Sequence, residues 1–70
     1  MLPLTLAKIG EENLIRKVGG KPEVRARLEE LGFVTGSAVT VLSTLGGNVI
    51  VCIKESRVAI SREMASRILV

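Results

Sequence analysis

The sequence predicts a mainly β fold with one inserted helix, arranged as a small barrel. Only one segment, Pro22–Leu31, carries apolar residues at the spacing of a helix. The remainder consists of short apolar or alternating segments separated by glycine-containing breaks, which is typical of strands joined by turns. The chain is also 47% hydrophobic. An open sheet this apolar would expose strand edges that invite aggregation, so a closed or nearly closed barrel is favoured.

The helix is expected over Pro22–Leu31. Val24, Leu28 and Leu31 lie at positions i, i+4 and i+7, which places them on one apolar face. Gly32 is expected to end the helix, because glycine readily adopts the left-handed conformation that terminates helices. The segment is therefore a short amphipathic helix with a defined end.

The residues after the helix are expected to form a tight turn that leads into a strand. Phe33 is predicted to pack back onto Leu28, three positions inside the helix end. Thr35 and Gly36 are expected at the centre of a type II turn, in which Gly36 supplies the positive φ. The alternation that follows predicts a strand over Ala38–Thr44.

The other elements are inferred from short apolar runs and turn residues. The segment Leu45–Asn48 contains two adjacent glycines and predicts a β-hairpin turn. Ser61 is expected to cap a single helical turn that runs through Ala65. The two strands before the helix are predicted to be antiparallel neighbours. The full strand prediction is Leu4–Ala7, Leu14–Val18, Ala38–Thr44, Val49–Lys54, Arg57–Ile60 and Arg67–Val70, with a turn at Glu55-Ser56.

The order of these motifs resembles the ferrous iron transport protein A (FeoA) family. The resemblance rests on Leu4-Thr5-Leu6-Ala7, Leu31-Gly32-Phe33-Val34-Thr35-Gly36, Leu45-Gly46-Gly47-Asn48, Arg57-Val58-Ala59-Ile60 and Met64-Ala65-Ser66-Arg67-Ile68. Thr35 stands where family members often have proline, so this turn is expected to be less rigid. The resemblance implies one SH3-like β-barrel domain over residues 1–70. It also implies a cytosolic accessory protein that binds and modulates the bacterial membrane ferrous iron transporter, FeoB.

The residue types exclude several kinds of catalytic and metal site. The sequence has no histidine and no aspartate, so histidine-based triads and mixed histidine and carboxylate metal sites cannot form. Cys52 is the only cysteine and is expected in the core, where a thiol behaves as a small hydrophobe. The glycine pairs before Lys21 and in Leu45–Asn48 lack the spacing of a phosphate loop. We expect no enzymatic activity, no cofactor and no intrinsic metal site, and iron enters only through the resemblance.

Charge and hydropathy indicate whether the chain is expected to bind nucleic acids or to cross a membrane. The ten basic and seven acidic residues are interspersed, and the net charge is only +3. Phe33 is the only aromatic residue, whereas proteins that bind single strands stack bases on several aromatic rings. Nucleic-acid binding is therefore not expected, although a weakly basic nucleic-acid-binding barrel stays an alternative. No apolar run is long enough for a membrane helix and no secretory signal is present, so we expect a cytoplasmic location.

A partner-binding surface is predicted at the helix end and the following loop. Leu31 and Phe33 also fit core packing against Leu28, so Val34 is the better exposed candidate. The two charged residues also fit a solvated helix face. An alternative function is the SH3-like domain of a metal-dependent transcriptional regulator, and homo-oligomers are compatible with the sequence. The predicted surface consists of Arg27, Glu30, Leu31, Phe33 and Val34.

Overall fold

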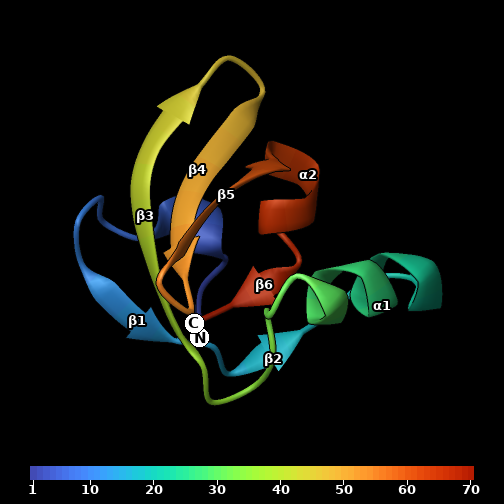
Figure 1. Ribbon diagram of the computed structural model, residues 1–70. Helices are drawn as coiled ribbons and strands as arrows, with labels where there is room; N and C mark the ends of the chain where they lie inside the picture. Colours follow the sequence, from blue (N-terminus) through green and yellow to red (C-terminus); the bar gives the residue numbers. More distant parts are fainter.

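In the computed structural model, which describes residues 1–70, six strands form two antiparallel sheets around one core (Figure 1). The larger sheet has the strand order β1-β3-β4-β5, and the smaller sheet pairs β2 with β6. The predicted class, mainly β with one inserted helix, is confirmed. The strands are β1 (Glu12–Leu14), β2 (Lys17–Val18), β3 (Ala38–Leu45), β4 (Asn48–Ile53), β5 (Ser56–Ser61) and β6 (Ile68–Leu69); the helices are the 3-10 helix η1 (Leu4–Leu6), α1 (Pro22–Glu30) and α2 (Arg62–Ala65).

Strands β3, β4 and β5 form a continuous meander that makes up most of the larger sheet. The predicted hairpin between β3 and β4 is confirmed, with Leu45 opposite Asn48 at its end. Gly46 has a φ of +60°, whereas Gly47 has no positive φ. One positive φ at the first central position is the requirement of a type II′ hairpin turn.

A β-bulge bends β3 at Leu42. The register with β4 shifts between Val41 and Ser43, so one extra residue is inserted on the β3 side. A bulge increases local twist and bends its strand. Figure 1 shows the resulting curvature of β3, which lets one long strand wrap around the core.

The turn between β4 and β5 lies at Lys54-Glu55, one residue before the predicted Glu55-Ser56. Lys54 has a φ of +50° and Glu55 a φ of +63°. Two positive φ angles are the requirement of a type I′ turn, the twist of which matches that of the flanking strands. Neither residue is glycine, so the sequence gives no local signal for this turn type.

The predicted strand Leu4–Ala7 is wrong, because this segment contains the 3-10 helix η1. The amide of Ala7 donates to the carbonyl oxygen of Leu4 at 3.0 Å and closes the turn. Leu4 is 1% exposed and Leu6 is 72% exposed. In a strand, two residues at this spacing would share a face. The tighter helical turn instead buries one leucine and exposes the other.

The predicted single strand Leu14–Val18 is also wrong, because the chain changes sheets at Ile15-Arg16. The amide of Ile15 donates to the carbonyl oxygen of Ser37 at 2.9 Å, and that of Arg16 to Leu69 at 2.8 Å. As a result, β1 pairs with β3 and β2 pairs with β6. The antiparallel pairing predicted between the two N-terminal segments does not occur.

The core is formed entirely by apolar side chains from both sheets and both α-helices. Cys52, which was expected in the core, is instead half-buried on the outer face of β4. The alternation along β4 explains this, since Val51 and Ile53 point inward on either side of Cys52. The core residues are Leu4, Ile15, Val18, Leu28, Phe33, Val39, Val41, Val49, Val51, Ile53, Ile60, Ala65 and Ile68.

The two ends of the chain lie side by side (Figure 1). Leu2 and Val70 exchange two backbone hydrogen bonds of 2.8 Å each. The predicted cap of α2 is also present, since the Ser61 hydroxyl accepts from the amide of Met64 at 3.1 Å. None of the helices has the length and apolar character needed to cross a membrane.

Candidate partner-binding surface

The end of α1 is held by a double hydrogen-bonded cap. Gly32 has a φ of +104°, and its amide donates to the carbonyl oxygen of Glu29 at 3.0 Å. The amide of Phe33 donates to the carbonyl oxygen of Leu28 at 2.9 Å. These two bonds define a Schellman motif. The predicted helix stop at Gly32 is therefore confirmed, with Leu31 as the capping residue rather than the last helical one.

Phe33 packs inside the barrel rather than on its surface. Both Phe33 and Leu28 are 0% exposed and belong to the same core cluster, the placement expected if the residue after the cap packs back on the helix. A buried ring cannot touch a partner without local unfolding. The prediction that Phe33 contacts a partner is therefore wrong, and this residue instead anchors the loop in the core.

The loop after the cap is fixed at both of its ends. Gly36 has a φ of +92°, and the amide of Ser37 donates to the carbonyl oxygen of Val34 at 3.0 Å, as expected for the predicted turn. The amide of Gly36 also donates to the carbonyl oxygen of Ile15 at 2.8 Å, and the amide of Ile15 returns a bond of 2.9 Å to Ser37. The loop thus presents its side chains from a rigid backbone.

The remaining predicted residues lie at the surface with different exposures. Leu31 is 37% exposed, whereas Val34 is half-buried. The expected order of exposure is thus reversed, because the cap turns Leu31 outward. Both charged residues are exposed, as expected of a solvated helix face. We define the helix-end surface as Arg27, Glu30, Leu31 and Val34.

Further apolar side chains are exposed outside the helix-end surface, and we call those around Leu45 the second apolar surface. Leu6, Ile9 and Leu45 are 72%, 63% and 73% exposed. Ile9 lines a cleft of about 100 Å³ together with Thr44, and Leu45 follows Thr44 in the chain. The high apolar content of the sequence indicates exposed apolar area, and the apolar positions around Leu45 are the next candidates for a contact after the helix-end surface.

Metal-binding and catalytic groups are dispersed over the surface. No three side chains of histidine, cysteine, aspartate or glutamate lie together where they could hold a metal ion. Cys52, the one thiol, lies on the face of β4 that points away from the core. It lines a cleft together with Glu12 and Glu55, but these three side chains are not placed to hold one metal ion. The helix-end surface offers apolar contact area and charges of both signs, which suits recognition of another protein.

Comparison with known proteins agrees with this architecture. The FeoA domain family matches residues 2–70. The chain belongs to the FeoA family. A relative from Methanocaldococcus jannaschii, named as an Fe(2+) transport protein A, is 37% identical over 70 residues, which cover 100% of this chain and 85% of the relative.

Two solved structures extend the comparison to the fold. FeoA of Stenotrophomonas maltophilia, solved in complex with zinc and described as a prokaryotic SH3 domain protein, has a TM-score of 0.83 and 24% identity over 99% of this chain and 88% of that one. A manganese-dependent transcriptional repressor has a TM-score of 0.84 and 19% identity, over 94% of this chain and 38% of the repressor. The predicted SH3-like fold is confirmed, and it is shared by FeoA proteins and by part of a regulator.

Proposed function

We propose that this chain is a non-catalytic cytoplasmic accessory protein of ferrous iron uptake. It binds the cytosolic part of the membrane ferrous iron transporter, FeoB, and modulates it. Membership of the FeoA family and the name of the relative from Methanocaldococcus jannaschii support the link to iron transport. The scattered carboxylates and the absence of histidine support a binding role over a catalytic one.

One observation carries the choice of contact surface. Leu31 is an exposed apolar side chain on a backbone held by the Schellman motif and by the bond between Gly36 and Ile15. A side chain presented from an ordered backbone loses little conformational entropy on binding. Arg27 and Glu30 flank it and supply a polar rim of both signs, the arrangement found at protein interfaces.

Calorimetric titration with the isolated cytosolic domain of the transporter from the same organism tests the proposal. Leu31→Asp is expected to weaken binding by tenfold or more, a loss of about 1.4 kcal/mol, because it places a charge in the apolar centre of the contact. Leu14→Asp is the matched control, since Leu14 is exposed on β1, outside the helix-end surface. Circular dichroism checks that both variants fold.

The possible outcomes test the proposed function and the proposed contact surface separately. Absence of binding by the unsubstituted chain would overturn the proposed function. Binding that survives Leu31→Asp but is lost in Leu45→Asp would keep the function and move the contact to the second apolar surface.

The structural similarity to a repressor supports one alternative, an SH3-like domain that binds a segment of a transcriptional regulator. That alternative predicts no affinity for the transporter. A weakly basic nucleic-acid-binding barrel would instead bind oligonucleotides with an affinity that falls steeply with salt. Repeating the titration at high salt and with a single-stranded oligonucleotide distinguishes these cases.

A further inference from the structure

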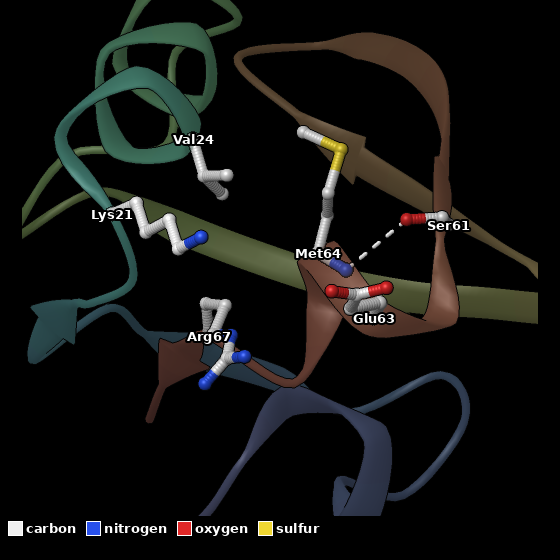
Figure 2. Close-up of a pocket in the computed structure, with 6 residues that line it drawn as sticks. All are labelled: Lys21, Val24, Ser61, Glu63, Met64 and Arg67. Carbon is white, nitrogen blue, oxygen red and sulfur yellow. Dashed lines mark hydrogen bonds between the residues drawn. The ribbon is translucent and has the colours of Figure 1, made fainter.

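A cleft between the start of α1 and α2 has the composition of a binding site and takes no part in the helix-end surface. Its volume is about 350 Å³, within the range of small-molecule and side-chain pockets. Figure 2 shows that the residues at the start of α1 face those from the end of β5, from α2 and from the segment after α2 across the cleft. The lining residues are Lys21, Val24, Ser61, Glu63, Met64 and Arg67.

Two of the lining side chains lie beside Gly20. A Cβ atom at Gly20 would lie 3.4 Å from Cγ of Arg67 and 3.5 Å from Cγ1 of Val24, which are ordinary van der Waals distances, so both side chains lie next to this glycine. The carbonyl oxygen of Arg67 accepts a hydrogen bond of 2.8 Å from the amide of Gly19. The backbone and aliphatic stem of Arg67 are thereby positioned, while its guanidinium group stays at the surface.

The charges of the cleft are separated by sign. Lys21 and Arg67 lie on one side of the cleft, and Glu63, in α2, lies on the other side (Figure 2). Among the side chains that line the cleft, the only hydrogen bond is the cap in which the Ser61 hydroxyl accepts from the amide of Met64, and neither Lys21 nor Arg67 makes a side-chain hydrogen bond. Both cationic groups are therefore free to bind an anion.

The chemistry of the lining selects the class of anion. A guanidinium group matches the two oxygens of a carboxylate, and a neighbouring ammonium adds a second charge-assisted hydrogen bond. Val24 and Met64 supply an apolar wall next to these cations, which a bare inorganic anion would leave uncovered. Glu63 repels a second carboxylate and accepts hydrogen bonds from amide donors, of which a peptide backbone has several.

We propose that this cleft binds an acidic peptide segment in which a glutamate or aspartate lies between aliphatic residues. The carboxylate lies between Lys21 and Arg67, and a neighbouring aliphatic side chain packs on Val24 and Met64. This proposal stands apart from the transporter assignment, which uses the opposite end of α1.

The test is an NMR titration of the ¹⁵N-labelled chain with a capped peptide of sequence Gly-Ser-Leu-Glu-Leu-Ser-Gly. A matched peptide with glutamine in place of glutamate is the ligand control. We expect saturable shifts of the amide signals of residues 19–21, 23, 24 and 61–67, with a Kd of about 1 mM or tighter. The glutamine peptide is expected to bind about tenfold more weakly, since it lacks the charge-assisted bonds.

Variants test the two parts of the cleft, its cationic side and its apolar wall, separately. The double variant Lys21→Gln with Arg67→Gln is expected to weaken binding about tenfold. The control, Lys8→Gln with Arg57→Gln, removes the same charge outside the cleft and is expected to leave the affinity unchanged. Met64→Gln, which keeps the length of the side chain, is expected to weaken binding about fourfold, the equivalent of one buried methylene group.

Four results would overturn the proposal. Shifts spread over the whole surface, or equal losses in the two double variants, would indicate unspecific charge attraction. Inorganic phosphate that shifts the same signals as tightly as the peptide would indicate a bare anion site. Equal affinity for the glutamate and glutamine peptides would remove the carboxylate from the contact.

Discussion

The amide of Gly36 donates to the carbonyl oxygen of Ile15 at 2.8 Å. This bond joins the loop after α1 to the corner at which the chain passes from one sheet to the other. Because Ile15 also donates to Ser37, the loop and the corner stabilise each other. The conformation that presents Leu31 therefore depends on both the local helix cap and a contact between distant parts of the chain.

The turn at Thr35-Gly36 can be tested with two substitutions of opposite effect. Thr35→Pro is expected to stabilise the fold by about 0.4–1 kcal/mol, because proline has the φ that the turn requires and restricts the unfolded chain. No backbone hydrogen bond from the amide of Thr35 would be lost. Gly36→Ala is expected to cost roughly 1 kcal/mol or more, since its φ is +92°. Urea denaturation measures both, and a destabilising Thr35→Pro would mean that the turn is of another type.

Phe33 is expected to be essential for stability rather than for contact with a partner. Its side chain is 0% exposed, so Phe33→Ala should cost about 3–5 kcal/mol. That loss is comparable to the whole net stability of about 3–5 kcal/mol of a domain this small. Phe33→Leu is the graded variant that should remain folded for measurement. A Phe33→Leu variant with unaltered stability and reduced partner affinity would place the ring in the contact after all.

A glycine in the turn between β4 and β5 is expected to stabilise the fold. Glu55 has a φ of +63°, which is unfavourable for a residue with a side chain. Glu55→Gly should raise the free energy of unfolding by about 0.5–1 kcal/mol, the strain relieved being partly offset by the greater entropy of the unfolded chain. Thermal and urea unfolding provide the measurement, with Ser56→Gly as the control outside the positive-φ turn. A loss of stability in Glu55→Gly would show that the glutamate side chain stabilises the turn.

Isolated protein is expected to bind no Fe(II) stoichiometrically. The physical reason is that no three metal-ligating side chains lie together. Anaerobic Fe(II) titration followed by calorimetry, and iron analysis after dialysis, measure this directly. Cys52→Ser tests the one soft ligand. Stoichiometric binding at micromolar affinity by the monomer would overturn this expectation and give the chain a direct role in sensing iron.

Several elements could be predicted because local interactions determine them. The end of α1 at Gly32, the positive φ of Gly36 and the Ser61 cap each involve residues at most a few positions apart. The hairpin at Leu45–Asn48 likewise depends on the conformational freedom of Gly46. At these points, the residue types are sufficient to specify the backbone.

Other features were decided only by tertiary contacts. The segment around Leu4 has the alternation of a strand but forms a 3-10 helix, which buries Leu4 in the core and leaves Leu6 exposed. The strand predicted through Ile15 breaks because its two ends pair with different sheets. The exposure of Leu31 likewise follows from the direction in which the cap turns the chain.

The cleft between α1 and α2 shows the same division most clearly. The sequence by itself determined that Lys21 precedes a helix and that Arg67 follows a short helical turn. Only the tertiary structure brought the two side chains to one cleft, through the pairing of Gly19 with Arg67. Local propensity acts over a few residues, whereas a site assembled from distant segments depends on how the sheets pair and pack.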